Sequence, residues 1–154
     1  MPCVKVSQGI LPPRNGQNGV TEMTYPATAI AQDAVWPASA TKYSETTHAL
    51  QVELRKKGYY TTAYLLDGKF GPATIKAWQR YMRDYGRYEG KYTGAIDGVV
   101  KSMTISAAYS FLAPDGGNAW GVIYNYDLTP SSIFPNYQTS LAWQKFLNYR
   151  RNKA

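Results

Sequence analysis

The sequence predicts a mainly α-helical protein built around a small helical bundle, and two observations support this. Apolar residues recur at helical spacing over residues 46–57, 72–85 and 102–113, and each stretch has glycine or proline at a boundary. In addition, an Asp-Gly turn precedes two of these stretches, at positions 30 residues apart. A repeat of this length is typical of a duplicated supersecondary unit.

The first expected helix covers residues 46–57. Thr46 or Thr47 is placed to cap its N-terminus, and Gly58 is placed to end it, since glycine readily adopts the left-handed conformation found just after helices. Residues 59–71 are expected to form a loop that holds a short, tyrosine-rich, strand-like segment.

The second expected helix, residues 72–85, follows the turn Asp67-Gly68. Gly68 can adopt a positive φ, and the Asp67 carboxylate can accept hydrogen bonds from nearby backbone N–H groups. Pro72 fits the first helical turn, where its missing N–H costs nothing. The apolar face of this helix is Ile75, Trp78, Met82 and Tyr85.

The third expected helix, residues 102–113, follows Asp97-Gly98, and Asp, Gly, Thr, Ile and Ala occupy identical offsets in the two copies. Its apolar face is Ile105, Ala108, Tyr109 and Leu112. A fourth helix is expected from Thr139, where residues 139–147 resemble residues 74–82. Because no Asp-Gly turn precedes it, it is either a further partial repeat or a coincidence of helix chemistry.

These motifs resemble the peptidoglycan-binding domain family over about residues 44–113. The resemblance is carried by Leu50-Gln51-Val52-Glu53-Leu54, Gly58-Tyr59-Tyr60, the run from Asp67 to Thr74, and Ala77 with Gln79. The second turn departs from the family pattern, since Lys101 and Ser102 stand where the first copy has Gly71 and Pro72.

The resemblance implies a three-helix bundle that binds bacterial cell-wall glycopeptide without cutting it. Its ligand groove would lie near the first loop and the second helix, which points to Tyr59, Tyr60, Asp67, Phe70, Trp78, Gln79 and Tyr81. Phe70 and Trp78 are expected in the core, whereas Tyr59, Tyr60 and Gln79 are expected to line an exposed groove.

The chain is expected to divide into an extended N-terminal arm (1–43), the bundle (44–113) and a loop with the extra C-terminal helix (114–154). Glycine and proline interrupt every window of the arm, in which residues 27–35 could hold a short helix. The anchors expected along it are Val4, Val6, Ile10, Leu11, Tyr25, Ile30, Val35 and Trp36. The bundle is expected to fold without either extension.

Charge and composition restrict the partners. The net charge is +7, which favours acidic partners, and 14 tyrosines supply rings that can stack on sugars. The densest basic runs, residues 55–57 and 150–153, fall at expected helix C-termini, where cations complement the helix dipole. No nucleic-acid-binding motif and no membrane-length apolar stretch occurs, so neither nucleic acid nor a membrane is an expected partner.

The chemistry-bearing residues do not form a recognisable catalytic set. His48 is the only histidine and Cys3 the only cysteine, so no motif for a metal, a cofactor or a Cys-His pair is present, and His48 is expected to be exposed or to cap a helix. Asp67 and Asp97 could serve as a carboxylate pair for glycoside hydrolysis, but their positions in turns favour a structural role. We therefore expect a protein that is not an enzyme.

Two functions fit these features. The first is a non-catalytic wall-binding protein, extracellular and attached to the bacterial cell wall. The second is a structural subunit of a bacteriophage virion, head or tail, that contacts other subunits through the N-terminal arm. The arm and the lack of a secretory signal after Met1 favour a combined reading, a virion protein that displays a wall-binding bundle. A purely structural decoration protein and the wall-targeting subunit of a separate hydrolase are the alternatives.

Overall fold

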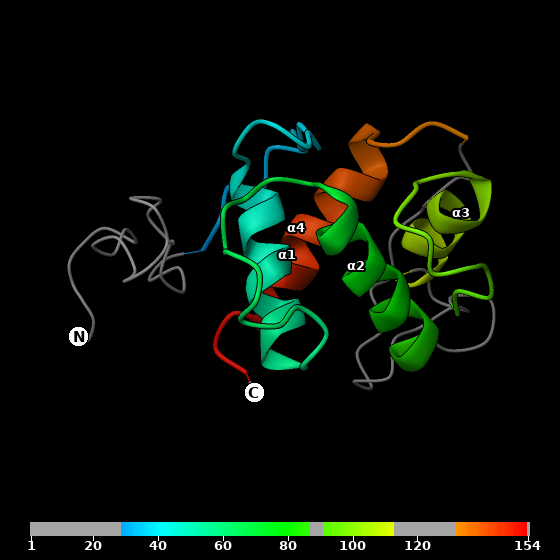
Figure 1. The fold of residues 1–154 in the computed structure, drawn as a ribbon. Coiled ribbons are helices and arrows are strands. Elements are labelled where there is room, and N and C mark those ends of the chain that lie inside the picture. Colours follow the sequence, from blue (N-terminus) through cyan, green and yellow to red (C-terminus); the bar gives the residue numbers. More distant parts are fainter. Residues whose placement is uncertain (1–28, 87–90, 113–131, 154) are drawn as a thin grey trace.

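The computed structural model describes residues 29–86, 91–112 and 132–153. Its helices, shown in Figure 1, are α1 (Glu45–Lys56), α2 (Pro72–Tyr85), α3 (Ser102–Ser110) and α4 (Tyr137–Arg150). These ranges contain no β-strand, which confirms the mainly helical class for the described part of the chain. The strand-like segment expected within residues 59–71 is therefore not formed. None of the helices described is both long and apolar enough to cross a membrane.

The first helix begins one residue earlier than expected because Ser44 caps it. The Ser44 hydroxyl accepts a hydrogen bond from the backbone N–H of Thr47, so the prediction of a cap at Thr46 or Thr47 is wrong. The prediction that Gly58 ends this helix in the left-handed conformation is confirmed, since α1 ends at Lys56 and Gly58 has a φ of 84°.

The two Asp-Gly turns also have the predicted conformation. Gly68 and Gly98 have φ values of 70° and 75°. Pro72 is the first residue of α2, which has the predicted bounds, whereas α3 ends at Ser110, three residues before the expected limit.

The four helices form one packed unit. Helix α1 packs against both α4 and α2, and α2 packs in turn against α3. Figure 1 shows α1 and α4 side by side with their C-terminal ends directed to the same end of the molecule. The fourth helix is therefore an integral member of the core.

Trp78 of α2 joins the parts of this core. Its side chain is fully buried. Its ring centroid lies 5.3 Å from that of Trp143 in α4, 5.6 Å from those of Trp36 and Phe70, and 5.5 Å from that of Phe134. One side chain thus contacts rings from the N-terminal segment, from the loop before α2 and from α4.

Residues 29–43 contribute to the same core. Of the expected anchors, Ile30 and Trp36 are buried, and the Trp36 indole N–H donates to the Thr47 hydroxyl at 2.9 Å, whereas Val35 is 61% exposed. Residues 29–35 are not helical, so the short helix expected there is not formed in the described part. The other expected anchors lie outside the described residues.

Candidate functional site

A buried glutamine of α1 holds the turn that precedes α2. The side-chain oxygen of Gln51 accepts from the Gly68 N–H at 2.8 Å. Its amide nitrogen lies 2.9 Å from the Thr74 hydroxyl and 3.1 Å from both the Lys69 carbonyl and the Asp67 carboxylate. Asp67 also accepts from the Lys69 N–H at 2.9 Å, which confirms its turn role. We call this arrangement, a buried Gln holding an Asp turn and the Thr of the next helix, a Gln clamp.

A second Gln clamp joins α2 to the turn before α3. The Gln79 oxygen accepts from the N–H groups of Asp97 and Gly98, both at 3.1 Å. Its amide nitrogen donates to the Thr104 hydroxyl at 3.0 Å and to the Val99 carbonyl at 3.2 Å. The pKa of the Asp97 carboxyl is lowered, chiefly because the ionised form accepts the Val99 N–H and then because it accepts from Gln79.

A third Gln clamp joins the two ends of the described chain. Gln144 of α4 accepts from the Ala34 N–H at 2.9 Å and donates to the Val35 carbonyl and the Thr46 hydroxyl, both at 3.0 Å. Asp33 lies 3.3 Å from the same amide nitrogen. Ala34 has a φ of 63°, close to the values of the two clamped glycines, although it is not a glycine. The turn Asp33-Ala34 is therefore a third copy of the Asp-Gly turn.

The third clamp supports the repeat interpretation of the fourth helix. Thr139, Trp143 and Gln144 occupy the offsets of Thr74, Trp78 and Gln79, and both tryptophans and both glutamines are buried. A glutamine five residues after a threonine, in three helices, is the signal that sequence reasoning missed. Helix α3 has Tyr109 at this offset and forms no such clamp within the described residues.

Most of the residues expected at a ligand groove lie in the interior. Phe70 and Trp78 are core residues, as expected, and Tyr81 is fully buried with its hydroxyl 3.0 Å from the Glu53 carboxylate. The prediction that Tyr60 and Gln79 line an exposed groove is wrong, because their exposed fractions are 4% and 0%. Gln79 is enclosed because both ends of its amide hold the second turn.

Tyr59 differs from these residues because its ring reaches the surface. Its hydroxyl donates to the Asp84 carboxylate at 2.7 Å, and its ring meets those of Tyr81 and Tyr85 edge to face. Partial burial and then the bond to Asp84 raise the pKa of Tyr59. The pKa of Asp84 is lowered, chiefly by its hydrogen bond from Arg83, so Asp84 is ionised at neutral pH.

A more exposed ring stands on the same loop. Tyr64 is 50% exposed, and its ring lies over Tyr60 with 5.7 Å between centroids. Arg55 stabilises this loop, since its guanidinium lies 5.8 Å from the Tyr60 ring centroid and donates to the Tyr64 carbonyl. We refer to the half-buried Tyr59 and Tyr85 and the exposed Tyr64 together as the tyrosine surface.

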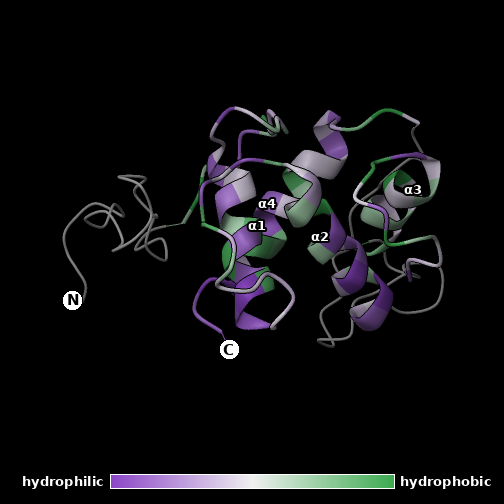
Figure 2. Ribbon diagram, viewed as in Figure 1, coloured by the Kyte–Doolittle hydropathy of each residue, from purple (hydrophilic) through white to green (hydrophobic). Residues whose placement is uncertain are grey.

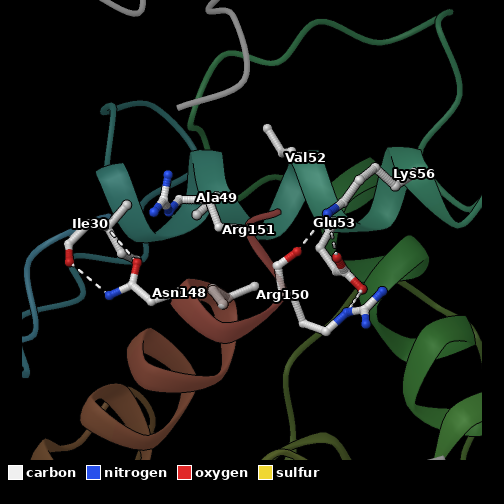
Figure 3. A pocket seen from close by; sticks show the side chains of 9 residues that line it. Ile30, Ala49, Val52, Glu53, Lys56, Asn148, Arg150 and Arg151 are labelled. Atoms are coloured by element: carbon white, nitrogen blue, oxygen red, sulfur yellow. Dashed lines mark hydrogen bonds and ion pairs between the residues drawn. The ribbon is translucent and has the colours of Figure 1, made fainter. Parts of the chain in front are cut away.

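A small pocket lies between Ile30, α1 and α4, as Figure 3 shows. Its volume is about 10 Å³, which is the scale of a single water molecule. Beside it, buried Glu53 pairs with Arg150 at 2.9 Å and with Lys56 at 3.2 Å. Asn148 exchanges two hydrogen bonds with the backbone of Ile30. This region joins α1, α4 and the N-terminal segment rather than receiving a ligand.

A larger and more open pocket lies beside the third clamp. Its volume is about 240 Å³, and its lining includes Asp33, Val35, Tyr43, Glu45 and Gln144. Asp33 and Gln144 already bond each other there, so two of the polar groups in its wall hold the turn.

His48 is 4% exposed, with its ring centroid 6.2 Å from that of Tyr43. The prediction that His48 is exposed or caps a helix is therefore wrong, since its position on the inner face of α1 buries it and Ser44 supplies the cap. Among the described residues, no three His, Cys, Asp or Glu side chains are placed to hold a metal ion.

Comparison with known proteins gave no match: no protein-family model, curated protein or solved structure is significantly similar to this chain. The resemblance to the peptidoglycan-binding domain family therefore rests on the motif residues. The structure assigns several of these, including Gln51, Asp67, Gly68, Thr74 and Gln79, to clamps that hold the fold.

Proposed function

We propose that this protein is a non-catalytic binding protein for bacterial cell-wall glycopeptide and that it contacts the glycan through the tyrosine surface. The observation that carries the proposal is the position of Tyr59 and Tyr64 on one loop that the first clamp holds in place. Gln51 approaches the Tyr60 hydroxyl at 3.3 Å, and that hydroxyl donates to the Leu65 carbonyl at 2.6 Å. A loop fixed in this way loses little conformational entropy on binding.

The chemistry of this surface suits a sugar. Tyrosine rings offer flat apolar faces and a polar edge, which match the C–H faces and hydroxyl groups of a pyranose. The ionised Asp84 beside Tyr59 adds a strong acceptor for hydroxyl or amide N–H groups. Both kinds of group are abundant on a glycopeptide.

Incorporation into a bacteriophage virion is the second half of the proposal, and its support comes from the sequence of the N-terminal segment. Because Ile30 and Trp36 pack on their own chain, contacts with other virion subunits are assigned to residues 1–28. A pull-down with isolated particles, comparing the full chain with a form that lacks residues 1–28, tests this assignment. Equal incorporation of the two forms would reject it.

Co-sedimentation with purified cell walls tests the binding role. Tyr64→Ser should weaken binding roughly tenfold, the effect of about 1.4 kcal/mol of lost contact. Tyr137→Ser is the matched control, since Tyr137 is 68% exposed and lies at the start of α4. Failure of the wild-type protein to sediment with walls would refute the proposal, as would equal binding by the two variants. Release of soluble sugars or peptides from the walls would refute the non-catalytic part.

A further inference from the structure

The open pocket beside the third clamp has no role in the proposed function, and we call it the third-clamp pocket. Its volume is about 240 Å³, many times the roughly 10–15 Å³ that one water molecule needs. It lies where the segment before α1 passes the N-terminal end of that helix. Figure 2 shows both hydrophilic and hydrophobic residues in this segment, residues 29–44. The walls of the pocket are mixed in the same way, which is typical of a site for an amphipathic ligand.

Two carboxylates line the third-clamp pocket, and neither pairs with a Lys or Arg side chain within the part of the chain that the structure describes. Asp33 accepts from the Val35 N–H and from Gln144 through Oδ1, so its Oδ2 atom has no partner there. Glu45 is exposed and is the first residue of α1. The helix dipole supplies only about half a positive charge at that end. In a chain of net charge +7, this local negative charge favours a cationic ligand.

Two buried hydroxyl groups in the same wall provide an independent sign of a ligand. Ser44 and Thr46 line the pocket and are 4% and 3% exposed. The Ser44 oxygen accepts from the Thr47 N–H, and the Thr46 oxygen accepts from the Gln144 amide. Within the described residues, neither hydroxyl donates its own proton to an acceptor. Because buried donors are normally satisfied, these two favour a ligand that carries acceptor oxygens as well as a cation.

The apolar part of the wall is exposed and fixed in position. Val35 and Tyr43 are 61% and 45% exposed. The Tyr43 ring packs on the first turn so closely that a Cβ added to Gly68 would lie 2.4 Å from it, and the Ser44 N–H donates to the Gly68 carbonyl at 2.9 Å. The first turn therefore holds one wall and the third clamp holds the other, so binding requires little ordering. Exposed apolar side chains beside carboxylates suit the methylene groups of an organic cation better than a metal ion.

We propose that the third-clamp pocket binds a primary ammonium group, carried on an aliphatic chain, in the peptide part of the wall glycopeptide. This inference rests on the proposed wall-binding function and names the part of the ligand that a second site recognises. The ammonium donates charge-assisted hydrogen bonds to the carboxylates of Asp33 and Glu45. Its methylene groups lie on Val35, and the peptide carbonyl oxygens accept from the buried hydroxyl groups of the wall.

Sedimentation of the full-length protein with two preparations of the same walls tests the inference. One preparation carries free amino groups, and in the other these groups are acetylated. We expect the wild type to bind the acetylated walls about tenfold more weakly. General charge attraction predicts the opposite sign, because acetylation removes positive charge from the walls and the protein carries a net charge of +7. Glu45→Gln should bind both preparations with the affinity that the wild type has for acetylated walls.

The matched control is Met103→Lys, because Met103 is 50% exposed, lies in the first turn of α3 and is not part of the pocket wall. Like Glu45→Gln, it makes the first turn of a helix more positive by one charge. It should retain the preference for walls with free amino groups. Equal loss of this preference in the two variants would overturn the inference. Equal binding of the wild type to both preparations would overturn the inference alone, whereas no binding to either would overturn the proposed function as well.

A small probe locates the site without using walls. In nuclear magnetic resonance spectra of the full chain, Nα-acetyl-L-lysine amide should shift the backbone amide signals of Val35 and Glu45. The same probe acetylated at its side-chain nitrogen should leave these signals in place, since it lacks the ammonium group. Equal shifts with the two probes, or no shift at either residue with the amine, would overturn the assignment of the pocket.

Discussion

The first two Gln clamps and the third use the same hydrogen bonds over very different separations in the chain. Gln51 and Gln79 each hold a turn within about twenty residues, whereas Gln144 holds a turn 110 residues away. The hydrogen bonds from each clamped backbone N–H to the glutamine oxygen are 2.8–3.1 Å long in all three. The same set of glutamine hydrogen bonds thus links consecutive helices in the first two clamps and joins the N-terminal segment to α4 in the third.

This difference has an energetic consequence. Closing a long loop costs more conformational entropy than closing a short one, so the third clamp needs other contacts that form together with it. Those contacts are aromatic: Trp36 lies beside the third turn, and Trp143 immediately precedes Gln144, and both rings meet Trp78. The clamp that closes the chain is therefore coupled to the aromatic core, as is the second clamp, whose Gln79 directly follows Trp78.

The largest expected effect is the loss of cooperative folding in a fragment that keeps only the local clamps. Residues 44–113, the bundle that the sequence predicts to fold alone, lack Trp36, Trp143 and Gln144. At about seventy residues, such a fragment is near the lower limit for a free-standing core. Circular dichroism should show a broad, non-cooperative melt for the fragment and a cooperative melt for the full chain. A cooperative melt of the fragment would show that the local clamps suffice.

Trp78→Ala should have the next largest effect, because this ring connects the local and chain-closing regions. Removing a fully buried tryptophan should lower the free energy of unfolding by about 3–5 kcal/mol. Urea unfolding followed by far-ultraviolet circular dichroism measures this. The control is Tyr137→Ala, an exposed aromatic, which should change the unfolding free energy by less than about 0.5 kcal/mol. Similar values for the two variants would contradict the central role of Trp78.

The sequence was informative where the causes of structure are local. The turns at Asp67 and Asp97 and the start of α2 at Pro72 follow from residues that are close together, and these predictions are confirmed. The third turn was hidden because Ala34 stands where glycine stands in the other copies, and its partner lies in α4. A contact between segments that are distant in the sequence does not change the local periodicity of apolar residues, so that periodicity cannot predict it.

For the candidate site too, the sequence did not predict contacts between segments that lie far apart in the chain. The resemblance pointed to Tyr60 and Gln79 as groove residues, but exposure depends on which surfaces other segments cover. The Tyr60 ring lies beneath Tyr64 and Arg55, and the second turn encloses Gln79. Conversely, the contact of Lys56 with the C-terminal end of α4 requires α1 and α4 to lie side by side, and the composition alone does not predict that arrangement.

Replacing the clamp glutamines one at a time should separate the two kinds of clamp. Gln144→Leu and Gln79→Leu each leave a backbone N–H and a carbonyl without their partner, so each should lower the free energy of unfolding by about 2–3 kcal/mol. Hydrogen exchange should differ between them. In Gln144→Leu, the Ala34 amide should exchange faster than in the wild type, whereas Gln79→Leu should accelerate the Gly98 amide. Unchanged exchange at Ala34 in Gln144→Leu would show that the third turn is held by other contacts.

The smallest expected effect concerns the turn residue itself, where opposite substitutions at equivalent positions of the two kinds of clamp should have effects of opposite sign. Ala34 has a φ of 63°, in a region where an L-residue is strained by roughly 1–2 kcal/mol. Ala34→Gly relieves this strain but gives the unfolded chain more freedom, at a cost of about 0.4–1 kcal/mol. The net stabilisation should lie between about 0 and 1.6 kcal/mol, seen as a small rise in the urea midpoint. Gly98→Ala is the matched reverse change, since φ is 75° and an added Cβ would lie 3.1 Å from the Pro72 carbonyl oxygen and 3.2 Å from Cγ of Lys76. It should destabilise by about 1–2 kcal/mol. If Ala34→Gly lowered the midpoint as much as Gly98→Ala, the Ala34 methyl group would be a required contact, and the third turn would not be equivalent to the Asp-Gly turns.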